Sequence, residues 1–196
     1  MKITPKLTFA KLPLTLLIAL GTASAAFAQG ETGTATLNGV QNGSLFDYTL
    51  TLNNTGTTPI GTFWYAWVPG GFFLPSTPAS ATAPTGWTAD IFQSYSIQYT
   101  ANSSADYLAG GSSLNFSFTS TDTPVALAGN VPIGTYAGTP IGTSYIYSAA
   151  PFSDSGYEFV VQSVPEPSVL GLLTAGFLGL VSTRRWKLRR PGTVIG

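Results

Sequence analysis

The sequence contains no cysteine and no histidine among its 196 residues. Without cysteine no disulfide can form, so the folded part must depend on the burial of apolar surface. The same two absences exclude Ser-His-Asp and Cys-His catalytic sites, and they remove the ligands that zinc favours. We therefore expect a non-catalytic protein with no metal site and no cofactor.

Basic side chains are absent from the whole middle of the chain. All eight Lys and Arg residues lie before residue 12 or after residue 183, whereas residues 29–163 hold seven acidic residues and no basic one, a formal charge of −7. A surface without cations does not attract phosphate groups electrostatically, which excludes nucleic acid as a partner. Acidic polysaccharides are repelled as well, unless cations bridge them.

The first 28 residues have the three parts of a secretory signal peptide. A basic region with three lysines precedes a short apolar run at residues 12–20, which is too short to span a membrane. Ala26 and Ala28 then form an A-x-A site, which predicts cleavage by signal peptidase before Gln29. The triplet at residues 23–25 also fits this rule, so the cut could lie three residues earlier.

The C-terminal tail holds the most specific pattern in the sequence. Pro165, Glu166 and Pro167 precede an uncharged, mostly apolar run at residues 168–183, about 24 Å long as a helix against a hydrocarbon core of about 30 Å. A basic cluster follows the run and consists of Arg184, Arg185, Lys187, Arg189 and Arg190. Because Lys and Arg beside a span stay in the cytoplasm, we expect the rest of the chain to lie outside.

This order of Pro-Glu-Pro, short membrane span and arginine cluster resembles the PEP-CTERM sorting signal of bacterial surface proteins, over residues 164–190. The resemblance implies processing by an exosortase, a membrane-embedded cysteine enzyme that reads Pro165, Glu166 and Pro167 and releases or transfers the exported part. It also implies export through the secretion translocon, an inner-membrane stage anchored by the C-terminus, and delivery to the cell surface or to the extracellular polysaccharide matrix of a biofilm. The alternative is an ordinary tail anchor in which Pro-Glu-Pro is incidental.

The exported part, residues 29–163, is long enough for one domain with one core. Large apolar residues alternate with polar ones over short runs, which predicts half-buried β-strands. We expect strands at residues 34–40, 46–53, 60–68, 87–92, 95–100, 114–119, 145–147 and 157–161, and a long proline-rich surface loop at residues 75–86. The predicted fold is an all-β, antiparallel immunoglobulin-like β-sandwich, between an N-terminal signal helix and a C-terminal transmembrane helix with a short tail at residues 191–196.

Residues 48–118 also resemble the extracellular domain that many PEP-CTERM proteins carry. The positions that support this resemblance are Asn54-Thr55-Gly56, Ile60, Pro84, Gly86, Trp87, Gly110-Gly111-Ser112 and Phe116-Ser117-Phe118.

A group of aromatic residues between positions 63 and 73 is the best candidate for a binding surface. Strict alternation sends Phe63, Tyr65 and Trp67 to one face of the strand and Trp64 to the other, so at least one ring is expected to face solvent. Exposed Trp64, Tyr65 and Trp67 rings can stack on sugars, which makes a carbohydrate-binding module for extracellular polysaccharide the first alternative function. Packing in the core is the interpretation that we favour for most of these rings, because a sandwich without disulfides needs bulky apolar filling.

The acidic residues give two further alternatives. A pair of carboxylates can hydrolyse glycosides, and Asp106, Asp122 and Asp154 could bind calcium from loops. However, the acids are scattered singly, most of them near predicted turns where Asp commonly caps the backbone, and no D-x-D-x-D-G loop is present. We expect neither a glycosidase nor a calcium site.

Overall fold

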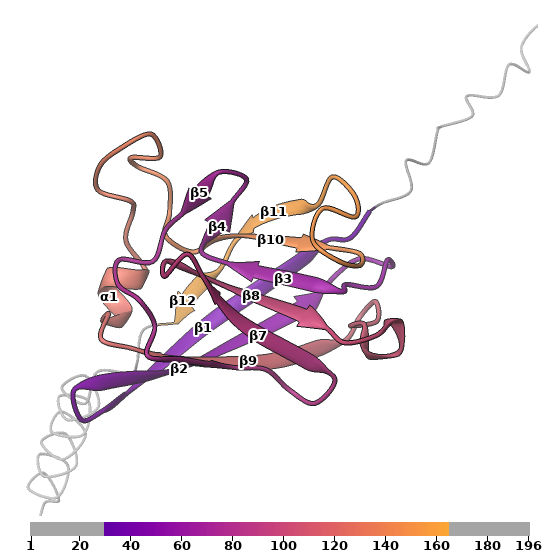
Figure 1. Cartoon of the computed structure of the whole chain (residues 1–196), viewed down its shortest axis with the longest axis horizontal. Helices are drawn as coiled ribbons and strands as arrows, with labels where there is room; N and C mark the ends of the chain where they lie inside the picture. The colour runs from indigo at the N-terminus through magenta and orange to yellow at the C-terminus, as the bar shows by residue number, and fades with distance from the viewer. Residues whose placement is uncertain (1–29, 165–196) are drawn as a thin grey trace, which may run out of the picture.

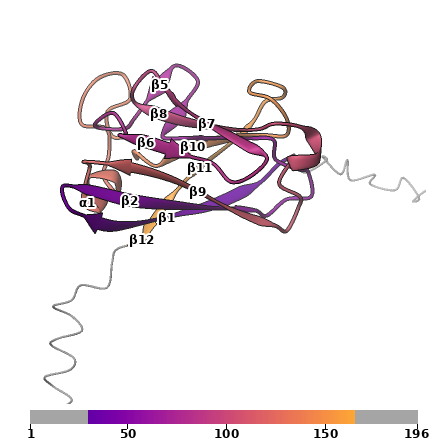
Figure 2. The ribbon, with the colours of Figure 1, turned by 60° about the horizontal axis from the view of Figure 1, so that its bottom comes forward.

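The computed structural model describes residues 30–164, which fold into two five-stranded β-sheets packed face to face (Figure 1). Figure 2 shows the sheets as two layers. The strands of the first sheet, in spatial order, are β12 (Gln162–Val164), β1 (Gly33–Asn42), β2 (Leu45–Asn54), β9 (Ser113–Ser120) and β6 (Ser80–Thr82). Those of the second are β11 (Tyr157–Val160), β10 (Thr143–Tyr147), β3 (Thr62–Tyr65), β8 (Ser96–Ala101) and β7 (Trp87–Phe92). The predicted all-β sandwich is confirmed at this level.

Three short elements complete the described part of the chain. The hairpin of β4 (Trp67–Val68) and β5 (Gly71–Phe72) follows β3, and η1 (Ser104–Asp106) is a single 3-10 turn. The helix α1 (Pro124–Leu127) begins where the side chain of Thr123 accepts a hydrogen bond from the Ala126 N–H. No helix within residues 30–164 is long and apolar enough to cross a bilayer.

The first sheet follows the alternating pattern of the sequence. Along β2, Tyr48, Leu50 and Leu52 are buried while the residues between them are exposed or half-buried, so one pleat face covers the core. The turn to β1 uses Gly43 with φ of 63°, a conformation that glycine adopts without steric cost. The neighbouring strand β9 continues the same face, because Phe116 lies opposite Leu50 in the register.

The two sheets meet through a layer of aromatic rings. Phe63 and Tyr99 of the second sheet reach Phe116 of the first, with ring centroids 5.6 Å and 4.5 Å apart. Trp87 also packs on Phe116 and donates its indole N–H to the Asp106 carbonyl at 2.9 Å. A core of large rings is consistent with a fold that depends on apolar burial.

Three details differ from the expected strands. The loop predicted at residues 75–86 contains the edge strand β6, which is compatible with its prolines because they lie outside the three paired residues. The strand expected at residues 95–100 begins at Ser96 instead, and Tyr95 is exposed beside a turn in which Gln93 and Ser94 have positive φ. The strand expected at residues 157–161 ends at Val160 as β11, and after the buried Val161 the chain passes to the first sheet and forms a further strand, β12, that was not predicted.

The two ends of the described chain leave the sandwich at opposite ends of the long axis (Figure 1). Within residues 30–164 all strand pairs are antiparallel except β1 with β12, and this parallel pair directs the chain toward the end that holds α1 and the β1–β2 turn. Several predicted features lie outside the described residues: the signal peptide with Ala26, Ala28 and Gln29, the motif Pro165–Pro167, the membrane helix at 168–183 and the basic cluster at 184–190.

Candidate functional site

Trp64 lies on the outer face of the second sheet, as alternation predicts, but Trp67 does not follow the alternation. Ala66 adopts φ of 55°, in the left-handed region, and this turns the chain so that Trp67 lies on the same side as Trp64. The indole rings stack with centroids 3.8 Å apart and planes within 4° of each other. The Ser144 hydroxyl accepts a hydrogen bond from the Ala66 N–H at 3.2 Å and so supports this unusual backbone.

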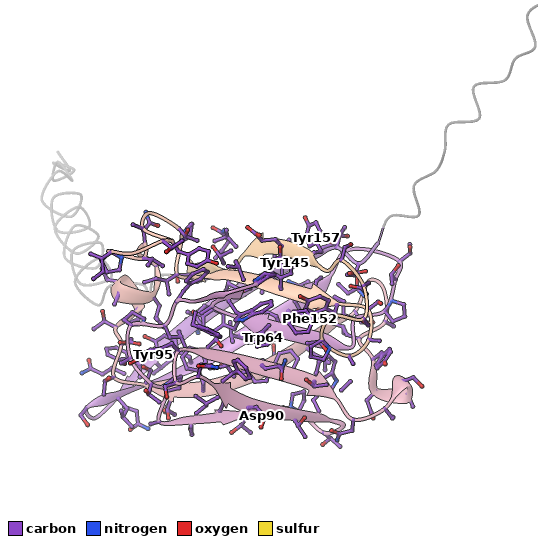
Figure 3. The ribbon with its side chains drawn as sticks, turned by 45° about the horizontal axis from the view of Figure 1, so that its top comes forward. Trp64, Asp90, Tyr95, Tyr145, Phe152 and Tyr157 are labelled. Carbon is purple, nitrogen blue, oxygen red and sulfur yellow. The ribbon has the colours of Figure 1, made fainter. Side chains whose placement is uncertain are left out.

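Seven rings from four parts of the chain gather on this face, and we call them the outer aromatic cluster. Its members are Trp64, Trp67, Phe72, Phe92, Tyr145, Tyr147 and Phe152. Figure 3 shows Trp64, Tyr145 and Phe152 on this side of the molecule. The edges of Phe92 and Phe152 meet Trp64 at 5.2 Å and 6.0 Å, and the indole N–H of Trp64 donates to the Ser96 hydroxyl at 3.1 Å. Close ring packing and this hydrogen bond fix the position of Trp64.

The three rings predicted to stack on sugars are therefore not available as exposed platforms. Trp64 and Trp67 are each 3% exposed beneath the other rings of the cluster, and Tyr65 is fully buried between the sheets. The prediction that one of these rings faces solvent is wrong for this arrangement, because rings from distant segments cover the tryptophans. The exposed rings of the cluster are instead Phe152, at 63%, and Phe92, at 38%. Sequence reasoning missed Phe152 because it stands alone in a loop rich in small residues.

One register row across the same face combines two rings of the cluster with three polar side chains. The strand register places Glu158, Tyr145, Trp64, Gln98 and Asp90 opposite one another on β11, β10, β3, β8 and β7. Burial raises the pKa of Tyr145, and a hydrogen bond to Glu158 with the negative charge of that residue raises the pKa further. Glu158 and Asp90 are exposed and Gln98 is half-buried. The face thus offers a ring, hydrogen-bonding groups and negative charge.

The spacing of these acids does not match a glycosidase pair. Asp90 and Glu158 lie on the two outermost strands of the sheet, four strand spacings or about 19 Å apart. Paired carboxyl groups in glycosidases are about 5 Å to 9.5 Å apart.

Asp154 holds the loop that carries Phe152. Its carboxylate accepts hydrogen bonds from the Ser148 N–H at 2.9 Å, from the Gly156 N–H at 2.8 Å and from the Ser148 hydroxyl. Burial alone raises the pKa of Asp154, but the hydrogen bonds from Ser148 and Gly156 outweigh it and hold the pKa below its usual value. The loop therefore has a polar anchor close to its exposed ring.

A second carboxyl group meets this anchor. Glu31, just before β1, is 7% exposed and shares a hydrogen bond with Asp154. Burial raises the pKa of Glu31, its own backbone N–H lowers it, and the neighbouring Asp154 raises it again, so that the net shift is upward. A hydrogen bond between two carboxyl groups requires a proton on one of them, and the direction of the shifts places it on Glu31.

The carboxylates of the loop acids considered for calcium accept hydrogen bonds from neighbouring loop residues. Asp122 accepts hydrogen bonds from the N–H and hydroxyl of Ser76, and Asp106 accepts one from the Ser103 hydroxyl at 2.7 Å. The Asp154 carboxylate likewise accepts hydrogen bonds, from the Ser148 and Gly156 N–H groups. Within residues 30–164, no three His, Cys, Asp or Glu side chains are grouped so that they could hold a metal ion.

Comparisons with known proteins assign no family and no activity to this chain. No protein-family model matches it, and no curated protein matches it. It is similar to two solved structures of a GH20 exo-β-N-acetylglucosaminidase from Vibrio harveyi, an inactive mutant and a complex with N-acetylglucosamine. Each has a TM-score of 0.39 and 11% sequence identity, over 68% of this chain and 18% of the enzyme. The chain spans less than a fifth of that enzyme's length, and a likeness this weak assigns no activity.

Proposed function

We propose that the chain is an exported, non-catalytic protein of the bacterial cell surface or extracellular matrix, processed through a PEP-CTERM sorting signal. The observation that carries this proposal is the order of elements in the tail, from Pro165 to Arg190. The described strands, β1 to β12, all precede the motif in the sequence, which suits a folded domain ahead of a sorting signal. In this proposal the folded domain is the part that is exported, and the tail is its sorting signal.

In the proposed route of export, the N-terminal end of the chain is cleaved first and the C-terminal end is processed afterwards. The translocon and signal peptidase act at Ala26, Ala28 and Gln29, and the basic cluster after residue 183 then holds the tail in the inner membrane. An exosortase-type enzyme next acts at the Pro-Glu-Pro motif. The domain itself is proposed to be an immunoglobulin-like sandwich, a class that its antiparallel layers and its length suit.

Substitutions in the motif test the proposal. Glu166→Gln keeps the size of the side chain and removes its charge, while replacing Pro165 and Pro167 with Ala removes the fixed φ of both positions. Both variants should be exported normally and accumulate in the membrane fraction in the longer form that retains the tail. Mass spectrometry of the C-terminus measures this, with Asp90→Asn as a matched control that removes one acid from the folded domain. Wild-type processing of both motif variants would refute recognition and leave an ordinary tail anchor.

Carbohydrate binding by the outer aromatic cluster is a second candidate function. The observation that favours it is the exposed ring of Phe152, which rests on buried tryptophans and shares its face with Gln98, Asp90 and Glu158. A ring face can cover the apolar side of a sugar, while amide and carboxylate groups accept hydrogen bonds from its hydroxyls. Because the exported part has no basic side chain, neutral or amino-bearing polysaccharides fit it better than acidic ones.

A binding assay with immobilised polysaccharides separates this role from a purely structural one. The exported protein should be retained by a neutral or an amino-bearing polymer and released by Phe152→Ala, with affinity falling about tenfold or about 1.4 kcal/mol. The matched control is Ile133→Ala, which removes another exposed apolar side chain, 81% exposed, on a different loop. Equal retention of both variants would refute the site. Release of sugar fragments during the assay would instead favour the glycosidase alternative.

A further inference from the structure

Asp90 differs from the other acidic residues of the folded domain in the surroundings of its carboxylate. Residues 30–164 contain seven acids, and six of them share a side-chain hydrogen bond with another described residue. These six are Glu31, Asp47, Asp106, Asp122, Asp154 and Glu158. The Asp90 side chain, exposed on the edge strand β7, has no such partner within residues 30–164. Its carboxylate is therefore free to bind a group from outside the domain.

The strand register places a free amide beside this carboxylate. Asp90 lies opposite Gln98, and Gln98 lies opposite Trp64 on the next strand. Side chains directly opposite in antiparallel strands have Cβ atoms about 4.5 Å to 5.5 Å apart, so the Asp90 carboxylate and the Gln98 amide are neighbours. The Gln98 side chain is half-buried, and among the described residues its amide has no hydrogen-bond partner. It can therefore both donate to and accept from a ligand hydroxyl.

Two partly exposed rings lie on the same face as this polar pair. Phe92 follows Asp90 by two positions, so both side chains leave β7 on the same side. The Phe92 ring is 38% exposed and meets Trp64 at 5.2 Å with the planes nearly perpendicular, and Phe152 meets Trp64 at 6.0 Å. In Figure 3, Asp90 lies at the margin of the face and Trp64 and Phe152 lie toward its middle. Apolar ring surface thus lies beside a carboxylate and an amide.

The distances and the charge of this face define the ligand that it fits. Trp64 and Asp90 are two strand spacings apart, about 10 Å, so an oligosaccharide reaches from the rings to the carboxylate better than a single sugar does. Residues 29–163 contain no Lys or Arg, so no basic side chain of the domain can neutralise Asp90. A ligand that pairs with Asp90 has to bring the positive charge itself.

We propose that this face binds amino-bearing oligosaccharides and that Asp90 selects them over neutral ones. The inference rests on the carbohydrate binding proposed above as a second candidate function, and it adds the class of sugar. A protonated sugar amine donates to Asp90, a hydroxyl group bonds to the Gln98 amide, and the rings of Phe92 and Phe152 cover apolar sugar faces. A neutral sugar makes the amide and ring contacts but lacks the ion pair.

Two oligosaccharides that differ in charge test the inference. One is an oligomer of glucosamine, and the other is the same oligomer with every amine acetylated and therefore neutral. The dissociation constant of each is measured with the purified full-length chain on a surface, in mildly acidic buffer where the amines are protonated. The wild type should bind the amino-bearing oligomer about fivefold more tightly, as for a favourable exposed ion pair. Added salt should reduce this difference.

Substitutions separate the role of Asp90 from that of the rings. Asp90→Asn should weaken binding of the amino-bearing oligomer about fivefold and leave binding of the acetylated one unchanged, whereas Asp90→Glu keeps the charge and should keep the preference. The matched control is Asp47→Asn, which removes an exposed acid from the first sheet and should change neither affinity. Phe152→Ala should weaken both oligomers alike, because a ring contact does not depend on the charge of the amine.

Any of four results overturns the inference. Equal affinity of the wild type for both oligomers, with a loss in Phe152→Ala, would refute selection by Asp90 and leave carbohydrate binding intact. Equal losses in Asp90→Asn and Asp47→Asn would assign the preference to the net charge of the domain. Equally tight binding of a lysine oligomer of the same charge would indicate a site for cations in general. If neither oligosaccharide binds, the proposed carbohydrate binding fails and the selection fails with it.

Discussion

Replacing Glu31 with Gln should stabilise the folded domain at neutral pH. Glu31 as a residue is 7% exposed, and the hydrogen-bonding neighbour of its carboxyl group is another carboxyl, Asp154. At neutral pH the pair has to keep a proton on Glu31 or place two negative charges in contact, and both states cost free energy. The amide of Gln keeps the shape of the side chain and donates to Asp154 without needing that proton.

The sign of this effect follows from the direction of the pKa shift of Glu31, and its size is about that of one net side-chain hydrogen bond. A carboxyl whose pKa is raised by folding contributes its stability below its ordinary value, near 4.5 for Glu31, and loses it as the pH rises through the raised value. The variant should therefore match the wild type near pH 4 and exceed it by about 1 kcal/mol at pH 7. For a domain of this size that corresponds to a Tm higher by roughly 4 °C. Asp154 acts in the opposite sense, because its lowered pKa gives stability that is lost as the pH falls.

Thermal and denaturant unfolding of residues 29–164, followed by circular dichroism from pH 4 to pH 8, measures the difference. Asp90→Asn is the matched control, since it removes one negative charge from an exposed position of the same domain. A double variant with Asp154→Asn should show smaller than additive changes if the two carboxyl groups interact. A Glu31→Gln difference that is independent of pH, or a less stable variant at pH 7, would refute the reasoning.

Three further predictions concern the core, the ions and the topology. The Tyr65 hydroxyl is buried with no hydrogen-bond partner among the described residues, whereas the Tyr48 hydroxyl donates to the Asp122 carbonyl at 2.6 Å. Tyr65→Phe should therefore leave the free energy of unfolding equal or raise it by about 1 kcal/mol, and Tyr48→Phe should lower it by about as much, as urea unfolding will show. Melting of the folded domain should be the same with and without EDTA; a large loss of stability in EDTA would reveal a structural ion. In intact cells an external protease should reach a tag inserted after Gly134, in an exposed loop, but not a tag after Gly196 while the tail is attached, and the reverse pattern would invert the orientation.

The strands with a regular alternation could be predicted from the sequence because their side chains have a period of two. In β2 and β9 the apolar residues fall on one face whatever the rest of the chain does, so these two strands and their half-buried character were predicted correctly. The acidic, cation-free surface and the absence of disulfides also follow from composition alone. The sorting signal is an inference from the sequence alone, because it lies outside the described residues.

The candidate site depended on contacts between distant parts of the chain, which no local pattern encodes. The left-handed turn at Ala66 moved Trp67 to the face of Trp64, and Phe152 then covered both rings from a loop more than eighty positions away. The Glu31–Asp154 pair joins the first and last parts of the domain in the same way. Alternation determines the face of the strand on which a side chain lies. Whether that side chain is buried depends on which distant residues pack against the same face, and this is decided only by the tertiary structure.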